Sequence, residues 1–373
     1  QLDELPPENS VVVAAHFNSI QESLEAVIIA MKHNLYTCEL MDKTILDCTK
    51  NNREQSKNRF FVEGDPQAIL MLEVRSDDSD KVHQLADDLV EDLKSNEFGY
   101  AYPQLTGKQI TQASDLRKAG LGLLGNIIGD RKAVACIEDT AVELKHLPDY
   151  ISEFTAMMKK FGQDAVYYAH AGAGELHLRP ILNLKKSEDI GLFRDITTEV
   201  AALVKKYNGS MSGEHGDGIV RSEFISDMIG KKNYQLIKQI KRTFDPENIF
   251  NRGKIIDPWP MDQSLRYEKD RDEPQIDTLM DFSDSMGILR AAEKCNGSGD
   301  CRQPQFAGGT MCPSYRATKD EKDSTRARAN ALREFLTRSD QSNPFDREEL
   351  KRAFDLCLSC KACASECPSN VDV

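Results

Sequence analysis

Residues 170–177 read His-Ala-Gly-Ala-Gly-Glu-Leu-His, and residues 212–218 read Ser-Gly-Glu-His-Gly-Asp-Gly. The two stretches hold three of the seven histidines in the chain, all close to glycines that let the backbone turn tightly and approach a ligand. The imidazoles of His170 and His177 and the carboxylate of Glu214 make up a recurrent catalytic zinc set, which leaves positions open for substrate. A single histidine is more often a satisfied structural residue, but the two motifs together favour a site.

Short β-like runs alternate with helical patterns on both sides of these motifs, from Val11 to about Ile255. The predicted strands are residues 11–17, 69–75, 132–139, 165–169 and 176–182. The predicted helices are residues 20–32, 82–94, 148–161 and 189–207. Strand–helix–strand pieces of this kind predict an α+β domain in which helices cover a sheet.

A change in composition separates this region from the rest of the chain. The segment 257–284 contains three prolines, many charges and few apolar residues, so we predict that it is a linker. After it, residues 324–337 and 347–358 lack glycine and proline and are rich in helix-forming residues. We therefore predict one domain at residues 1–256 and a small, mostly helical domain at residues 285–373.

The composition and charge limit the classes of function. With 373 residues, 40% of them hydrophobic and 29% charged, the chain is typical of a soluble globular protein of two or three domains. Its formal net charge of −13 argues against nucleic acid or an anionic membrane surface as the main partner. No apolar run approaches the ~20 residues of a transmembrane helix, and no signal-peptide pattern is visible. These features predict a cytoplasmic location.

Most of the cysteines gather near the C-terminal end, where dense clustering indicates metal in a reducing compartment rather than disulfides. Residues 357–368 follow the pattern C-x2-C-x2-C-x3-C-P of bacterial two-cluster ferredoxins. This pattern predicts two iron–sulfur clusters of the 4Fe-4S type, and the alternative is a pair of four-thiolate zinc sites. The predicted ligands are Cys295, Cys301, Cys312, Cys357, Cys360, Cys363 and Cys367.

In such ferredoxins the last cysteine of each run ligates the other cluster. By this rule Cys312 would complete the cluster of residues 357, 360 and 363. Cys367 would join Cys295 and Cys301, which leaves the second cluster one thiolate short. A three-iron cluster, a non-cysteine ligand and a cysteine beyond Val373 are three open solutions.

The histidine motifs resemble those of the FAD-linked oxidase C-terminal domain, found in D-lactate and D-2-hydroxyglutarate dehydrogenases of the vanillyl-alcohol-oxidase superfamily. This resemblance implies an antiparallel sheet covered by helices, a ferredoxin-like cap that is followed here by the iron–sulfur domain. It also implies that His170, His177 and Glu214 ligate a divalent metal, expected to be zinc. By the same resemblance His215 is the catalytic base, which takes the hydroxyl proton of the substrate.

Other stretches extend the resemblance. Residues 244–254 resemble the closing F-D-P-x-x-x-x-N-P-G-K of the family, where the chain returns to the flavin, which implies that Asn251 binds the cofactor. Residues 116–120 resemble the segment that places an arginine on the substrate carboxylate, so Arg117 is the candidate. Arg179 stands where one branch of the family has an asparagine near the substrate. An extra arginine at this position favours a second carboxylate on the substrate.

The joint prediction is a fragment of a flavin- and iron–sulfur-dependent D-2-hydroxyacid dehydrogenase. No glycine-rich phosphate loop lies ahead of Val11, so FAD is expected to be bound mainly by a domain absent from this chain, and the fragment alone is expected to be inactive. Electrons would pass from a small 2-hydroxy acid to FAD and through the clusters to a quinone or another carrier, which allows peripheral association with the inner face of the membrane. Two alternatives are an oxidase fragment with an unused metal site and a non-catalytic iron–sulfur electron-transfer scaffold.

Overall fold

The computed structural model describes residues 5–50, 52, 55–338 and 343–373. The chain divides into two compact units, which we describe separately. The sheet unit contains residues 1–46, 58–114 and 133–269, and the cysteine unit contains residues 47–57, 115–132 and 270–373.

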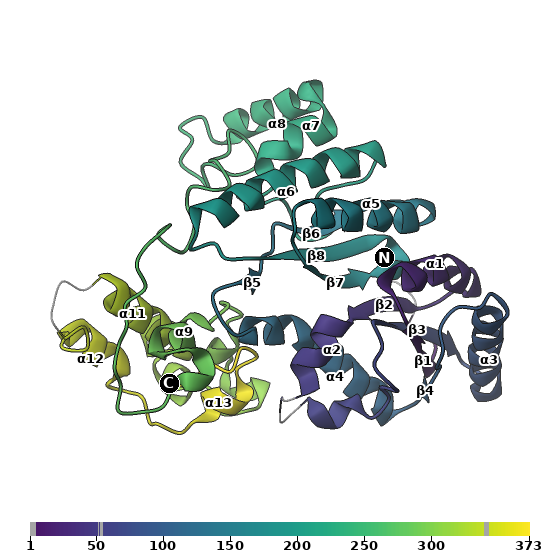
Figure 1. The fold of residues 1–373 in the computed structure, drawn as a ribbon, viewed down its shortest axis with the longest axis horizontal. Coiled ribbons are helices and arrows are strands. Elements are labelled where there is room, and N and C mark those ends of the chain that lie inside the picture. The colour runs from purple at the N-terminus through teal and green to yellow at the C-terminus, as the bar shows by residue number, and fades with distance from the viewer. Residues whose placement is uncertain (1–4, 51, 53–54, 339–342) are drawn as a thin grey trace. The chain divides into compact units, whose positions relative to one another are not determined.

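An eight-stranded sheet forms the centre of the sheet unit, with the strand order β4-β1-β3-β2-β7-β8-β5 and β6 paired to β8 (Figure 1). The pairings that join β4, β1, β3, β2, β7, β8 and β6 are antiparallel. The strands are β1 (Asn9–Phe17), β2 (Thr37–Asp42), β3 (Ala68–Ser76), β4 (Gln104–Leu105), β5 (Lys132–Ala133), β6 (Ile137–Ala141), β7 (Ala165–His170) and β8 (Glu175–Leu182). The order β4-β1-β3-β2 of the first half is that of a ferredoxin-like βαββαβ unit.

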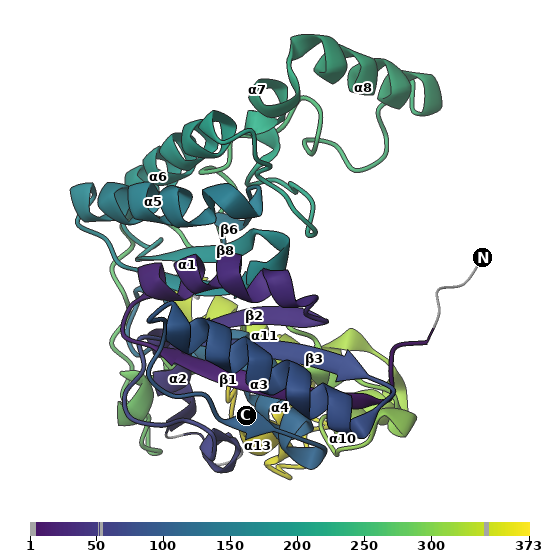
Figure 2. The ribbon, with the colours of Figure 1, turned by 90° about the vertical axis from the view of Figure 1, so that its right-hand side faces the viewer.

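Four helices lie in a row on one face of this sheet, and Figure 2 shows them following one another in the order α6, α5, α1 and α3, with α3 in front of β1 and β3. These helices are α1 (Ile20–Ala30), α3 (Ser79–Ser95), α5 (Leu147–Lys160) and α6 (Ser187–Lys206). Side chains that precede two of these helices cap their first turns. The side chain of Ser19 caps α1 by accepting the N–H of Glu22, and the side chain of Asp78 caps α3. Apolar residues from all four helices and from the strands form one buried core between the two layers.

The opposite face of β8 carries polar side chains. Successive residues of a strand point to opposite faces of the sheet. Leu176 and Leu178 belong to the core under the helices. Glu175, His177 and Arg179 therefore point to the face that these four helices do not cover.

Two further helices of this unit follow α6 in the chain, α7 (Ile225–Ile229) and α8 (Lys231–Phe244). The α8 helix has no buried residues. Among the described helices of the chain, none is both long and apolar enough to cross a membrane.

The predicted fold class, an antiparallel sheet covered by helices, is confirmed, and most predicted elements are present with ends shifted by a few residues. The predicted strand at 132–139 is instead two short strands, β5 and β6, and the register of β6 against β8 shifts between Ile137 and Thr140. The sequence pattern did not predict β2 or the helices α2 (Lys43–Lys50) and α4 (Lys108–Leu123). The position of β2 between β3 and β7 depends on long-range pairing, which local periodicity does not encode.

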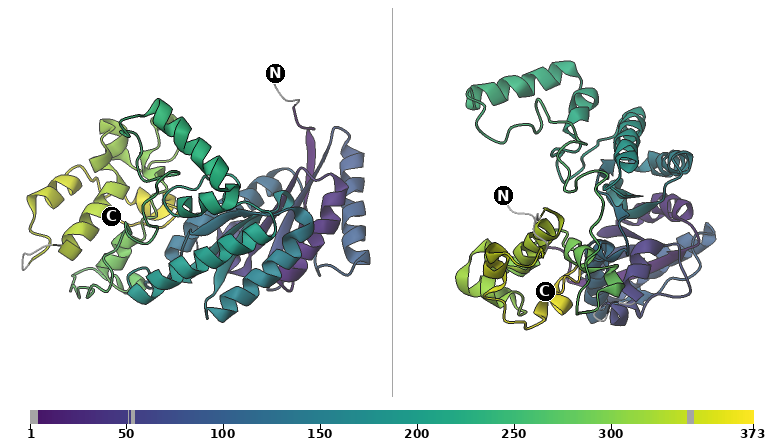
Figure 3. Two further views of the ribbon diagram at one scale, coloured as in Figure 1. Left: turned by 90° about the horizontal axis from the view of Figure 1, so that it is seen from above. Right: turned by 60° about the vertical axis from the view of Figure 1, so that its left-hand side comes forward.

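The cysteine unit is built from short helices joined by irregular segments (Figure 3). Its described helices after residue 284 are α9 (Ile288–Glu293), α10 (Pro313–Thr318), α11 (Thr325–Arg338), α12 (Glu348–Phe354) and α13 (Ala362–Glu366). The C-terminal part of α4 belongs to the same unit and approaches the Cys367-Pro368 step closely. A Cβ atom added to Gly122 would lie 2.5 Å from Cβ of Pro368, so this approach requires glycine.

Candidate functional site

A tight connection between β7 and β8 brings the first two histidines together. His170 ends β7, a short 3-10 turn covers Ala171–Ala173, and β8 begins at Glu175. Gly174 has a φ of +72°, and a Cβ atom there would lie 2.0 Å from the carbonyl oxygen of Val142, so only glycine fits. As a result, the rings of His170 and His177 have centroids 5.1 Å apart.

Hydrogen bonds orient both rings toward the same point. Nδ1 of His177 lies 2.6 Å from the backbone oxygen of Glu138, and Nδ1 of His170 lies 2.9 Å from the Glu39 carboxylate. Each Nδ1–H can therefore donate, which leaves Nε2 as the atom that can ligate a metal. The two Nε2 atoms lie 3.2 Å (His170) and 3.8 Å (His177) from Oε1 of Glu214. Burial, reinforced by the neighbouring imidazoles, lowers the pKa of His177, so this ring is neutral near pH 7.

The loop that carries the third and fourth residues is fixed by a buried carboxylate. Asp139 on β6 is completely buried and accepts the backbone N–H groups of Glu214 and His215, both at 3.0 Å. It also accepts the hydroxyl of Ser212 at 2.6 Å and faces Arg221 at 3.3 Å. Burial opposes ionisation of Asp139, but these and other hydrogen bonds outweigh it and hold the pKa of the carboxyl below its usual range.

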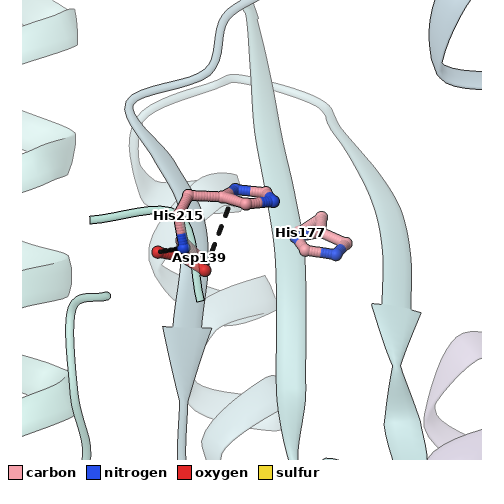
Figure 4. A group of neighbouring side chains, drawn as sticks. All are labelled: Asp139, His177 and His215. Carbon is pink, nitrogen blue, oxygen red and sulfur yellow. Dashed lines mark hydrogen bonds and ion pairs between the residues drawn. The ribbon is translucent and has the colours of Figure 1, made fainter. Parts of the chain in front are cut away.

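His215 stacks on His177, with ring planes 9° apart and centroids 5.1 Å apart (Figure 4). The side chain of His215 is 42% exposed, so a small molecule can reach it. Its Nδ1 lies 3.6 Å from Oε1 of Glu138, and the other oxygen of Glu138 pairs with the guanidinium of Arg179. His215, the predicted base, and Arg179, the arginine predicted for a second substrate carboxylate, are therefore linked through Glu138.

Two groups of three residues within the described ranges have ligand atoms that all lie within 4.8 Å of one another. One is His170, His177 and Glu214, the predicted ligand set, and the other is Asp139, His177 and His215. The Asp139 carboxylate is already occupied by N–H and hydroxyl donors, so the first group is the better candidate. Two imidazoles that can ligate through Nε2, together with a carboxylate, fit a divalent metal.

Sequence reasoning missed four acidic residues around this site, Glu39, Glu138, Asp139 and Glu175. Burial, a hydrogen bond with Asp139 and the nearby Glu214 raise the pKa of Glu175 to about 7. The adjacent pair Glu138 and Asp139 within a predicted strand was a usable signal, since charged residues are rarely buried without partners. The role of Glu39 had no local signal.

The other two predicted site residues of the oxidase resemblance lie outside this group. Asn251 lies on the loop after α8 at a φ of +46° and lines a hollow. The charged residues of this hollow are the basic Lys241, Arg242, Arg252 and Lys254 and the acidic Asp245 and Asp257. This excess of basic residues fits an anionic group such as the phosphates of FAD. Arg117 lies on α4 within the cysteine unit, and its contact with substrate stays a prediction.

A family model described as FAD linked oxidases, C-terminal domain, matches residues 6–255, about two thirds of the chain. The chain belongs to this family. Residues 6–255, which include the histidine site and most of the sheet unit, thus form the FAD linked oxidase C-terminal domain, as the motifs at residues 170–177 and 212–218 predicted.

Curated relatives extend the match across both units. The D-2-hydroxyglutarate dehydrogenase of Haemophilus influenzae is 30% identical over 421 residues, which cover 99% of this chain and 40% of that protein. The D-2-hydroxyglutarate dehydrogenase of Pseudomonas putida is 29% identical, with 100% of this chain and 41% of that protein covered. The chain therefore spans about two fifths of the length of these relatives.

Among solved structures, the 4-ethylphenol oxidase from Gulosibacter chungangensis is similar with a TM-score of 0.45 and 14% sequence identity. The similarity covers 68% of this chain and 55% of that one.

A second family model, described as a 4Fe-4S dicluster domain, matches residues 291–371, after the FAD linked oxidase C-terminal domain. Cys312, Cys357, Cys360 and Cys363 line one hollow of the cysteine unit. Burial raises the pKa of the Cys312 thiol, but hydrogen bonds from Ser314, Thr325 and Arg328 outweigh it and hold that pKa below its usual range. Because the thiolate is the ligand form of cysteine, this environment fits an iron–sulfur cluster.

The remaining cysteines of the tail form a second group. Cys295 and Cys301 are buried, each within a small cluster of apolar residues. Cys367 packs against both of these apolar clusters. Within the described residues, no group of three close metal-binding side chains includes a cysteine. The match to the 4Fe-4S dicluster domain supports iron–sulfur clusters over the zinc alternative.

Proposed function

We propose that this chain is the substrate-side and electron-transfer part of a D-2-hydroxyacid dehydrogenase that acts on an acid of the D-2-hydroxyglutarate type. The observation that carries the proposal is the convergence of His170, His177, Glu214 and His215 on one exposed point of the sheet. Membership of the FAD linked oxidase family and the names of the relatives support this reaction class.

His170, His177 and Glu214 would hold a divalent metal, zinc in our proposal. Bound there, the metal would supply positive charge that lowers the pKa of the substrate hydroxyl. The contribution of the protein is to orient both imidazoles. It does so through the carbonyl of Glu138 on one ring and the carboxylate of Glu39 on the other.

His215 is the proposed general base. Its Nδ1 lies 3.6 Å from Glu138 and its Nε2 lies 3.2 Å from Oε1 of Glu214, so Nε2 would accept the hydroxyl proton once Glu214 ligates the metal. The carboxylate of Glu138 then stabilises the imidazolium that forms. FAD, when bound, supplies the acceptor for the hydride that leaves the α-carbon.

Two arginines are the proposed substrate anchors. Arg179 lies two residues beyond His177 on the same face of β8 and shares Glu138 with the base. A guanidinium beside the base suits a bidentate contact with a second carboxylate, which favours a dicarboxylic acid over lactate. Arg117 is proposed for the carboxylate next to the hydroxyl carbon, and Asn251 for the flavin side.

The cysteine unit is proposed to carry electrons onward, from FAD through two clusters to an acceptor such as a quinone or a soluble carrier. In this arrangement residues 1–256 oxidise the acid, residues 257–284 link the parts, and residues 285–373 hold the clusters. Peripheral association with a membrane would follow if the acceptor is a quinone.

The test uses the longer protein that includes an FAD-binding domain, purified without oxygen and shown to hold FAD and metal. D-2-hydroxyglutarate should bleach the flavin absorbance rapidly, D-lactate more slowly, and the L-acids not at all. The variant His215→Asn should lose this bleaching by a factor of about 10²–10⁴ while keeping its metal and flavin. Absence of bleaching with every acid would refute the proposal and favour the electron-transfer scaffold.

A further inference from the structure

The cysteines of the C-terminal region form two groups in space. The Cys312 group lines one hollow and consists of Cys312, Cys357, Cys360 and Cys363. The Cys301 group consists of Cys295, Cys301 and Cys367, which lie close enough together for their charges to act on one another. Helix α11 gives a hydrogen-bond donor to a cysteine of each group.

The two donors differ in charge. Nη1 of Arg328 donates to Sγ of Cys312 at 3.3 Å, and this contact is buried. The backbone N–H of Arg326 donates to Sγ of Cys301 at 3.4 Å. The Cys312 group therefore has a cationic donor, whereas the donor to the Cys301 group is a neutral peptide. Hydrogen bonds from a charged donor are the stronger kind.

The guanidinium of Arg328 is a buried charge without an acidic partner among the described residues. The side chain is 1% exposed, and its other hydrogen bonds go to the hydroxyl of Ser314 and to the carbonyl of Ala353, both at 2.9 Å. A charged side chain is almost never fully buried unless it is paired. Arg328 also lines the hollow of the Cys312 group, so a thiolate-bound cluster in that hollow would supply the negative charge.

Other cations near the cysteines are compensated by carboxylates. The guanidinium of Arg326 is 27% exposed and lies 2.6 Å from Oε1 of Glu321. The ammonium of Lys361 is 57% exposed and lies 2.8 Å from Oδ1 of Asp372. Exposed pairs of this kind contribute little net charge to their surroundings. Arg328 differs from both cations, because its charge is buried and its described partners are neutral groups.

Solvent exposure of the two groups differs in the same direction. Cys360 is exposed and Cys357 is half-buried, whereas Cys295 and Cys301 are buried. Burial penalises a growing negative charge, and water stabilises it. The hydrogen bonds and the exposure therefore both favour an added electron at the Cys312 group, since these are two of the factors that set the potential of an iron–sulfur cluster.

We propose that the cluster of the Cys312 group has the higher reduction potential of the two, and that the buried charge of Arg328 is the main reason. Reduction adds one electron and breaks no bond to a ligand, so the new negative charge lies beside the guanidinium. The first electron should reside on this cluster about 10–100-fold more often than on the other. This ratio corresponds to about 60–120 mV, at about 59 mV per tenfold for one electron.

The inference rests on the proposed electron-transfer function, because it requires two loaded clusters, but it is independent of which acid the protein oxidises. The experiment uses the cluster-loaded protein, purified without oxygen and grown with arginine that carries ¹⁵N only in its guanidinium. Dithionite, which is oxidised to sulfite, supplies one electron per chain. Pulsed electron paramagnetic resonance should then detect a guanidinium nitrogen coupled to the reduced cluster. The backbone nitrogen of Arg326 carries no label and stays silent.

Two variants test the role of the charge. Arg328→Gln keeps an N–H donor but removes the charge, so it should abolish the nitrogen coupling. In a redox titration, its preference for the first electron at the Cys312 group should fall by about tenfold or more. Arg326→Gln is the matched control, because Arg326 lies two residues earlier on the same helix. It should keep both the coupling and the preference.

A first electron that shows no guanidinium coupling in the wild type would overturn the proposal. So would an unchanged preference in cluster-loaded Arg328→Gln. If Arg328→Gln loads no clusters, the coupling measured in the wild type and in Arg326→Gln decides the question. A wild-type protein that assembles no clusters would refute the proposed electron-transfer function itself, whereas two clusters without the coupling would refute this inference alone.

Discussion

The buried carboxylate of Asp139 accepts the backbone N–H of His215 at 3.0 Å, across 76 residues of chain. It accepts the neighbouring N–H of Glu214 at the same distance. One aspartate on β6 thereby fixes both the proposed metal-binding carboxylate and the proposed base. Because charge-assisted hydrogen bonds of this kind are short and directional, Asp139 acts as a positioning residue for the whole loop.

Replacing Asp139 should therefore weaken metal binding without removing a proposed ligand. Asp139→Asn loses the charge that faces Arg221 and holds the two N–H groups, so we expect zinc affinity to fall by about 10–100-fold. Competition with a chromogenic chelator measures this affinity. Asp164→Asn, at an exposed position, should leave it unchanged. Equal zinc affinity in Asp139→Asn and the wild type would contradict the positioning role.

Replacing Arg179 should change the choice of acid more than the rate of chemistry. In the longer, FAD-loaded protein, Arg179→Met should raise KM for D-2-hydroxyglutarate by about 10–100-fold, the effect of losing a hydrogen bond to a charged group worth about 1.5–3 kcal/mol. The KM for D-lactate should change much less. Arg75→Met is a matched control, because Arg75 is also a strand arginine paired with a glutamate. An equal loss for both acids would assign Arg179 to the reaction itself.

Arg328 should stabilise the iron–sulfur part of the chain. Its side chain is almost fully buried and donates to Sγ of Cys312 at 3.3 Å, to the hydroxyl of Ser314 and to the carbonyl of Ala353. We expect Arg328→Met to lose about 3 kcal/mol of stability and therefore to unfold at a lower temperature. The variant should also lower the reduction potential of the cluster, because N–H donors to ligand sulfurs tune that potential. Redox titration of Arg328→Lys, which keeps the positive charge, separates the change in reduction potential from the loss of stability. Arg352→Met, an exposed change on α12, should have neither effect.

The acid stability of the sheet unit should depend on Arg194. This side chain on α6 pairs with Glu223 at 2.8 Å and with Asp262 at 2.7 Å, and its hydrogen bonds lower the pKa of both carboxyls. A lowered pKa gives stability that is present above the unfolded pKa, about 4, and is lost as pH falls through the folded pKa values. Urea unfolding of Arg194→Gln should show a shallower loss of stability below about pH 4.5. Lys160→Gln, which removes an exposed ion pair, should keep the wild-type pH profile. Identical pH profiles for Arg194→Gln and the wild type would contradict the assignment.

Local sequence was sufficient for features whose residues are neighbours in the chain. His170 and His177 meet because a single glycine turn joins two adjacent strands, so their motif carries its own geometry. The spacing of Cys357, Cys360 and Cys363 likewise specifies a cluster-binding loop without long-range information. The apolar periodicity of residues 82–94 predicted the helix α3 for the same reason.

The partners that fix the site depend on tertiary structure. Glu39 reaches His170 only because β2 pairs with β7 in the sheet. Asp139 reaches the loop at 212–218 because β6 lies beside β8. The sequence by itself therefore determined the class of fold and indicated the candidate site residues, whereas the folded sheet decided which acidic residues lie against them. The physical reason is that strand pairing brings distant segments within hydrogen-bonding distance, and no local pattern of residues specifies which strands will be neighbours.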